Sequence, residues 1–82
     1  MKYTVELKPK AEKDLKTMPK NESRRMYDAL LALESGLKGE IKKLTDHWPE
    51  YRLRMGNWRA LFEIEGDRII VYSIRHRREA YR

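Results

Sequence analysis

The stretch that decides the fold is Tyr51-Arg52-Leu53-Arg54-Met55-Gly56-Asn57-Trp58-Arg59. Its side chains alternate between apolar and basic up to a Gly-Asn pair, which is typical of a strand that enters a tight two-residue turn. Such a turn pairs Arg54 with Arg59 across the two strands. The stretch therefore predicts a β-hairpin with arginines on one face and apolar residues on the other.

The arginines on this predicted face are the first candidates for function. Like charges directly opposite one another in a sheet are unfavourable, by roughly 0.2–1 kcal/mol. A bound phosphate would remove that cost. Two other interpretations stay open at this point: the arginines can form an ordinary solvated face, and a three-residue turn would break the pairing of Arg54 with Arg59.

Composition narrows the classes of function. A chain of 82 residues forms one domain, whose active site is expected to be a shallow groove rather than a deep cavity. The chain has 19 Lys and Arg against 13 Asp and Glu, a formal charge of +6, and an isoelectric point near 9.7. This balance suits a phosphate-rich ligand or an acidic protein partner, without choosing between them.

Several kinds of site are disfavoured. The chain has no cysteine, which excludes disulfides, thiolate metal sites and cysteine nucleophiles. Its two histidines have no accompanying cluster of carboxylates, so no metal or other cofactor is expected. Neither a signal peptide nor a membrane span is evident, and a soluble cytoplasmic protein is predicted.

The rest of the chain predicts a small α+β domain. Alternation predicts a strand over 3–7, and apolar residues recur at helical spacing between Pro9 and Pro19 and again after Asn21, which can cap the second helix. Residues 40–50 show no period and are expected to form a connecting loop. The remaining chain predicts strands over 51–55, 58–65 and 68–75.

This β-α-α-β-β-β order predicts an antiparallel sheet with the two-helix hairpin packed on one face and the other face open for a ligand. Strand alternation assigns the apolar residues of the last two strands to both faces. The face toward the helices is expected to carry Phe62, Ile64, Ile69 and Val71. The face with the arginines is expected to carry Leu61, Ile70, Tyr72 and Ile74 as an apolar floor.

The carboxy-terminal segment forms a second candidate cluster. It reads Arg75-His76-Arg77-Arg78-Glu79-Ala80-Tyr81. If the last two strands are antiparallel neighbours, this segment lies beside Trp58 and Arg59, and both clusters share one groove. Taken singly, each residue is more simply a surface residue or part of a solvated tail. Their convergence favours a functional site.

These motifs resemble the RelE/ParE superfamily of bacterial and archaeal type II toxins, and more closely the RelE-type messenger RNA interferases. The resemblance covers essentially the whole chain. Its marks are Ala11-Glu12-Lys13-Asp14-Leu15, Met18-Pro19, Tyr51-Arg52-Leu53-Arg54, Trp58-Arg59-Ala60-Leu61-Phe62 and His76-Arg77-Arg78-Glu79-Ala80-Tyr81. The fold expected from the resemblance is RelE-like, which agrees with the element order above.

The resemblance implies ribosome-dependent cleavage of mRNA, in which the ribose 2′-hydroxyl attacks the adjacent phosphate. The residues implied for catalysis are Arg52, Arg54, Arg59, Arg77 and Tyr81. Arginines match phosphate oxygens and stabilise the charge of the transition state, and Tyr81 is expected to stack on a base. Arginine stays protonated and is a poor base, so His76 is the candidate general base. The alternative is that the reaction uses no strong base.

Three classes of function remain open. The first is an endoribonuclease toxin, inhibited by a cognate antitoxin whose acidic or amphipathic segment occupies the basic groove. The second is a ParE-like toxin that acts on DNA gyrase. The third is a non-catalytic RNA-binding module, which would hold phosphate without aligning it for attack.

Overall fold

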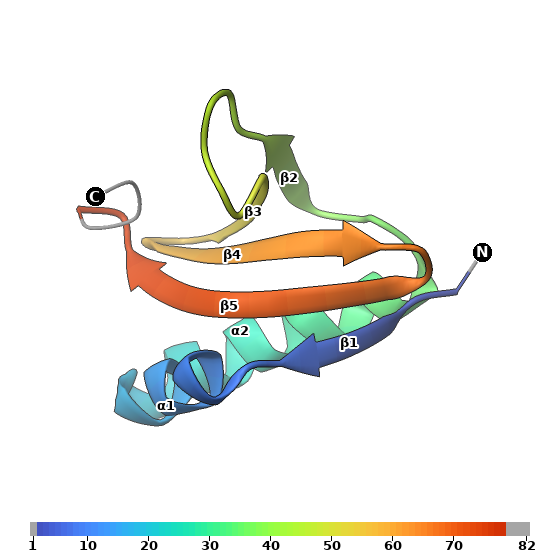
Figure 1. Ribbon diagram of the computed structural model, residues 1–82. Coiled ribbons are helices and arrows are strands. Elements are labelled where there is room, and N and C mark those ends of the chain that lie inside the picture. Colours follow the sequence, from blue (N-terminus) through green and yellow to red (C-terminus); the bar gives the residue numbers. More distant parts are fainter. Residues whose placement is uncertain (1, 79–82) are drawn as a thin grey trace.

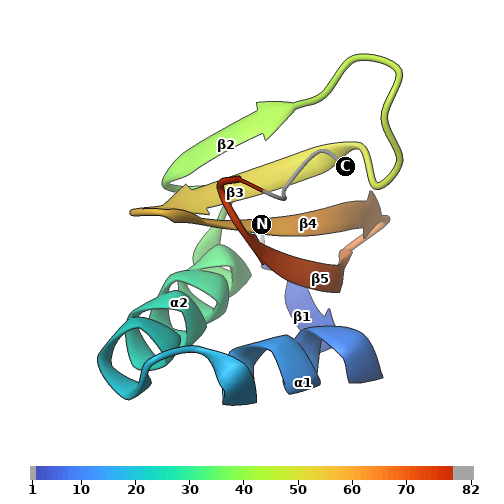
Figure 2. The ribbon, with the colours of Figure 1, turned by 90° about the vertical axis from the view of Figure 1, so that its left-hand side faces the viewer.

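The computed structural model describes residues 2–78, which form one five-stranded sheet with two helices packed on one face (Figures 1 and 2). The strands lie in the order β1-β5-β4-β3-β2. The elements are β1 (Thr4–Leu7), α1 (Pro9–Thr17), α2 (Lys20–Ala32), a short 3-10 turn η1 (Leu33–Ser35), β2 (Glu40–Lys43), β3 (Tyr51–Met55), β4 (Trp58–Glu65) and β5 (Arg68–His76). The predicted α+β class is confirmed, and the sheet face opposite the helices is called the open face below.

The two helices are separated by a single break at Pro19. Helix α1 begins at Pro9, whose fixed φ suits the first helical position. Its last residue is Thr17, two residues before Pro19. Helix α2 then begins at Lys20, so Asn21 lies inside its first turn and is not the cap that the sequence predicts. Neither helix is long and apolar enough to cross a membrane within residues 2–78.

Two features of the sheet differ from the prediction. Residues 40–43, expected to be loop, form β2 and pair antiparallel with β3. This strand has a single apolar side chain, Ile41, which leaves no period in the sequence to detect. The first strand is also parallel to its neighbour β5, so the sheet is mixed rather than purely antiparallel. The first and last strands of the described chain therefore lie side by side, with β1 at the edge of the sheet.

The hairpin of β3 and β4 has the predicted register. Met55 pairs with Trp58, Arg54 with Arg59 and Arg52 with Leu61. Gly56 has a φ of 60°, which a glycine adopts without steric cost at the first position of a tight turn. The arginines of this hairpin therefore share the open face, as the alternation predicts.

A β-bulge in β5 changes the faces of the last strand. Leu61 pairs with Ser73 while the next residue, Phe62, pairs with Val71, so Tyr72 is an extra residue without a partner on β4. Beyond it, the alternation is shifted by one. Ile74 consequently lies in the core beneath the helices instead of on the open face, which corrects the sequence assignment.

The core lies between the sheet and the helices. Its fully buried side chains include Phe62, Ile69 and Val71 from the sheet, together with Met26 and Leu30 from α2. Leu61 and Ile70 are also buried but lie outside this cluster, since they point to the open face. The loop over 44–50 rises on that face (Figures 1 and 2). It is closed by a hydrogen bond from Leu44 N to Glu50 O of 2.6 Å.

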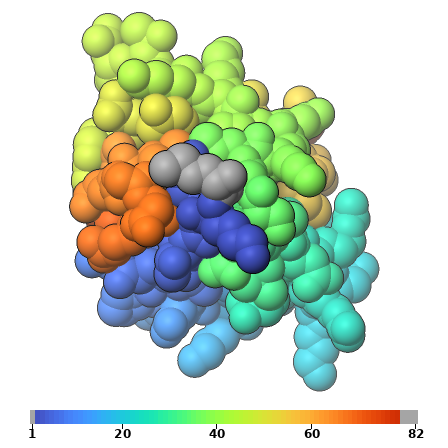
Figure 3. All heavy atoms as spheres, turned by 90° about the vertical axis from the view of Figure 1, so that its right-hand side faces the viewer, coloured from blue at the N-terminus to red at the C-terminus, as the bar shows by residue number. Residues whose placement is uncertain are grey.

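The outer edge of β1 is covered by the segment that follows α2. Figure 3 shows β1, in dark blue, between the end of the sheet where β4 turns into β5, in orange, and this segment, in green. The backbone N–H of Tyr3 donates to the carbonyl of Glu34, and that of Val5 donates to the Glu34 carboxylate at 3.1 Å. Glu34 therefore occupies donors that would otherwise be available to another strand.

Candidate nucleic-acid interface

Three arginines from adjacent strands form a row across the open face. Arg54 of β3 pairs with Arg59 of β4, and Arg59 pairs with Arg75 of β5. Neighbouring strands lie about 4.8 Å apart, so three positive charges are held side by side by the backbone. These three residues are called the arginine row. Arg52 lies on the same face, in the adjoining row of residues.

Two of these arginines carry buried N–H groups with no acceptor among residues 2–78. They are Nη1 of Arg52 and Nε of Arg75. A buried donor without an acceptor costs about 1–3 kcal/mol, and more when the group is charged. The arrangement is therefore unfavourable in isolation, and an anion that accepts from these donors would relieve both the desolvation and the repulsion.

The other two arginines have partial partners. Arg54 Nε lies 3.4 Å from a carboxylate oxygen of Glu40, its neighbour on β2. Arg59 Nη1 donates to the backbone carbonyls of Gly56 and Trp58 at 3.0 and 3.1 Å. These carbonyl contacts orient the guanidinium of Arg59 without neutralising its charge.

A cleft next to the arginine row extends the basic surface. It has a volume of about 270 Å³ and is lined by Lys42, Leu44, Thr45, His47 and Arg52. Lys42 lies directly opposite Arg52 on β2. His47 Nδ1 donates to the carbonyl of Pro49 at 2.9 Å, which fixes the imidazole within the 44–50 loop. The open face thus joins four strands and one loop in a basic surface.

His76 does not lie on the open face with Arg54 and Arg59, although it lines a hollow beside α1 together with Arg75. Because of the bulge at Tyr72, His76 pairs with Trp58 and falls on the face toward the helices. Its ring packs edge-on against Trp58, with 5.4 Å between centroids. Trp58 in turn donates from Nε1 to Glu22 of α2 at 3.0 Å. The expectation that His76 and Arg59 share one groove is therefore wrong for the histidine side chain.

The last two predicted residues lie at or beyond the end of the described chain. Arg77 follows β5 and is exposed, and its backbone N donates to the carbonyl of Asn57 at 2.7 Å. This bond ties the end of β5 to the β3–β4 turn. Tyr81 lies outside the described residues.

Arg75 is the residue that sequence reasoning missed. Simple alternation from Ile70 places Arg75 on the helix side and His76 on the open face, and the bulge reverses both. No local signal in the sequence marks Tyr72 as an extra residue. The residue types carry one indirect signal. Uninterrupted alternation would place the charged Arg75 in the core and the apolar Ile74 on the open face, and the bulge avoids both placements.

The end of β5 is held by a carboxylate from α1. Strand β1 pairs with β5 only as far as Leu7 and Val71. Beyond that point, Asp14 occupies the free edge of β5, because its Oδ2 accepts a hydrogen bond of 2.9 Å from Ile74 N. Lys10 Nζ lies 3.0 Å from Oδ1 of the same carboxylate. The residue after Ile74 is Arg75, so this contact fixes the strand that presents it.

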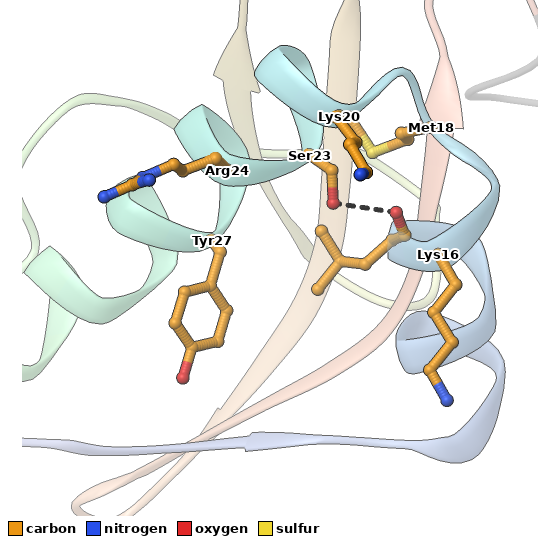
Figure 4. Close-up of a pocket in the computed structure, with 7 residues that line it drawn as sticks. Lys16, Met18, Lys20, Ser23, Arg24 and Tyr27 are labelled. Atoms are coloured by element: carbon orange, nitrogen blue, oxygen red, sulfur yellow. Dashed lines mark hydrogen bonds between the residues drawn. The ribbon is translucent and has the colours of Figure 1, made fainter.

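The helix layer carries a separate hollow. A hollow between α1 and α2 is lined by Leu15, Lys16, Met18, Lys20, Ser23, Arg24 and Tyr27, and is crossed by a hydrogen bond from Ser23 Oγ to Leu15 O (Figure 4). It lies on the helix layer, away from the open face. Within residues 2–78, no group of three His, Asp or Glu side chains could hold a metal ion.

Comparison with known proteins agrees with this architecture. Residues 5–81 match the family described as "ParE toxin of type II toxin-antitoxin system, parDE". Toxin RelE3 of Methanocaldococcus jannaschii is 34% identical over 74 residues, which cover 84% of each chain.

Solved toxin–antitoxin complexes have the same fold. The RelB–RelE complex from Methanococcus jannaschii matches with a TM-score of 0.74 and 30% identity, over 88% of this chain and 89% of that chain. The archaeal RelE–RelB complex from Pyrococcus horikoshii OT3 matches with a TM-score of 0.78 and 25% identity, over 98% and 100%. RelBE2 from Mycobacterium tuberculosis has a TM-score of 0.80 at 20% identity, over 93% and 99%.

Proposed function

Because this chain belongs to the RelE/ParE superfamily of type II toxins, we propose that it is a ribosome-dependent endoribonuclease that cleaves mRNA in the decoding site. The observation that carries the proposal is the arginine row, together with the two buried N–H groups of Arg52 and Arg75 that have no acceptor in residues 2–78. Such a surface favours a ligand with a high density of negative charge. A phosphate that gains negative charge during the reaction matches it, because that charge can accept from several guanidinium N–H groups.

The proposed chemistry needs no cofactor. The ribose 2′-hydroxyl loses its proton to water as its oxygen bonds to the adjacent phosphorus. The bond from phosphorus to the 5′-oxygen breaks, and the departing oxygen takes up a proton from water. The intermediate state carries more negative charge on its phosphoryl oxygens than the ground state. Arg59 and Arg75 are assigned to these oxygens, where fixed guanidinium groups stabilise the transition state more than the substrate.

Arg52, Arg54 and Arg77 are assigned to the flanking backbone. Arg52 lines the cleft beside the row, and Arg54 is already paired in part with Glu40. Arg77 adjoins the β3–β4 turn through its backbone bond to Asn57. Tyr81 keeps the assignment that the resemblance implies, stacking on a base.

His76 is better explained as a supporting residue than as the general base. It packs on Trp58, on the sheet face opposite the arginine row. We therefore favour the version of the mechanism without a strong base, in which alignment and charge neutralisation lower the barrier.

The proposed protein partner is a RelB-type antitoxin. The solved complexes that this fold matches pair RelE with RelB. An acidic or amphipathic segment of such a partner would satisfy the arginine row in place of RNA, and would thereby inhibit the toxin. The formal charge of +6 is compatible with this assignment.

The decisive experiment is to induce the protein in cells and map the 5′ ends of translated mRNA. We expect cuts registered with codons, which disappear in Arg59→Ala. The matched control is Arg68→Ala, since Arg68 lies at the other end of β5 and pairs with Glu6 at 2.8 Å. This control removes one arginine of the same strand and should leave the cuts in place.

The second candidate function is inhibition of DNA gyrase, because the matching family is described by its ParE toxin. Accumulation of gyrase-linked DNA breaks with intact mRNA would replace the ribonuclease proposal. Tight RNA binding with neither effect would instead indicate a non-catalytic module.

A further inference from the structure

An aromatic pair lies on the open face beside the arginine row. Trp48 of the 44–50 loop exposes 64% of its surface, and its ring centroid lies 4.7 Å from that of Tyr72. Tyr72 is the extra residue of the β5 bulge. We call these two side chains the aromatic platform. Tyr72 supports the indole from one side, and most of the indole surface remains accessible.

Cations surround this platform on two sides. Arg75 follows Tyr72 by three residues along β5, a separation of roughly 10 Å along a strand. His47, which precedes Trp48, lines the same cleft as Arg52. On the other side, Lys8 Nζ lies 5.9 Å from the centroid of the Tyr72 ring. An accessible indole thus adjoins the groups assigned to phosphate.

Aromatic rings next to a basic groove are the usual means of holding single-stranded nucleic acid, because every base offers a flat face for stacking. We propose that Trp48, supported by Tyr72, stacks on an unpaired nucleobase of the RNA whose phosphates bind the arginine row. This inference rests on the proposed function and adds a base-binding subsite to it. The subsite binds a base near the scissile phosphate, and stacking alone does not select the identity of that base.

A nucleobase fits this platform better than an apolar protein surface does. Protein docking sites are contiguous apolar patches of a few hundred Å², whereas Trp48 is flanked by Lys8 and the Arg52 cleft. The other strongly exposed aromatic side chain in the described chain, Tyr27, lies on α2 in the helix layer beside Leu31. That surface is the better candidate for an apolar partner.

The test uses the purified protein and a short single-stranded RNA with 2′-O-methyl riboses, which cannot be cleaved through the 2′-oxygen. Binding should quench tryptophan fluorescence in the wild type, and the quench should be lost in Trp48→Phe. Trp48→Ala should weaken binding by about 5- to 150-fold, the range expected for one stacked base. Trp48→Phe should show a smaller loss.

Abasic substitutions identify the base itself. Removing one base at a time from the RNA should reveal a position whose loss weakens binding to the wild type. The same loss should be silent in Trp48→Ala, since the stacking partner is already gone. Tyr27→Ala serves as the control for a lost exposed aromatic ring and should bind like the wild type. Circular dichroism and thermal unfolding verify that each variant folds.

The outcomes separate this inference from the proposed function. Equal RNA affinity and an unchanged abasic pattern in Trp48→Ala would refute the platform even if mRNA is cleaved. Loss of antitoxin binding alone in that variant would assign the platform to a protein partner, and would likewise refute it. A Trp48-dependent abasic signal without cleavage on ribosomes would retain the subsite and overturn the nuclease assignment.

Discussion

At the scale of single residues, Arg75 shows how function and stability oppose one another in this sheet. It is half-buried, faces Arg59 across the ladder, and its Nε has no acceptor within residues 2–78. A residue chosen for stability would not have these properties. The unfavourable contacts become favourable only when an anion is bound.

Replacing Arg75 should therefore change stability and activity in opposite directions. Arg75→Leu should raise the free energy of unfolding by about 1 kcal/mol, because the substitution removes a like-charge contact and an unpaired donor. It should lower cleavage by about 100- to 1,000-fold if Arg75 contacts the transition state. Chemical denaturation and single-turnover cleavage measure the two effects. Parallel losses of both would show that Arg75 is structural.

His76 gives a second prediction at this scale. Because its ring packs on Trp58 away from the arginine row, His76→Gln should leave the shape of the pH profile for single-turnover cleavage unchanged. A modest loss of stability is expected, since the contact with Trp58 is altered. Disappearance of one ionisation from the profile would restore His76 as the general base.

At the scale of elements, the position of the arginines depends on how β5 is held at its end. Asp14 replaces the missing neighbour strand by accepting from Ile74 N. Asp14→Ala leaves that amide without its partner and should cost about 1–3 kcal/mol of stability. Asp14→Asn keeps an acceptor oxygen and should cost less. Asp28→Ala, at an exposed position of α2, is the matched control.

Hydrogen exchange tests the local nature of this effect. In Asp14→Ala, the amide of Ile74 should exchange faster, whereas amides at the β4–β5 turn should be unaffected beyond the change in global stability. Faster exchange throughout the sheet would mean that Asp14 supports the whole fold rather than the end of β5.

The same elements show what the sequence can predict. The hairpin of β3 and β4 was predicted to the residue, because alternation and the Gly-Asn turn determine its register together. Strand β2 was missed because only Ile41 is apolar among its four residues. The bulge at Tyr72 was missed because the alternation of the sequence continues through the inserted residue without a break. The bulge exchanges the faces of Arg75 and His76. The resemblance supplied the family where local patterns could not.

At the scale of the whole molecule, the distribution of paired and unpaired charges is more informative than the formal charge of +6. The open face carries cations at both ends of β5, but Arg68 is neutralised by Glu6 and Glu65, whereas Arg75 has no such partner within residues 2–78. Binding of single-stranded RNA should therefore weaken with salt according to the arginine row rather than the total charge. On a log–log plot, each neutralised phosphate contributes a slope of about −0.7.

The effect of a single substitution on this salt slope should depend on where the residue lies. Arg59→Ala and Arg75→Ala should each make it shallower by about 0.7, since each removes one phosphate contact. Arg68→Ala should leave the slope unchanged although it removes the same formal charge. Trp48→Ala should weaken binding at every salt concentration with no change of slope, because stacking releases no counterions. Equal slopes for Arg59→Ala and Arg68→Ala would mean that RNA responds to net charge alone, and the arginine row would lose its role as the specific contact.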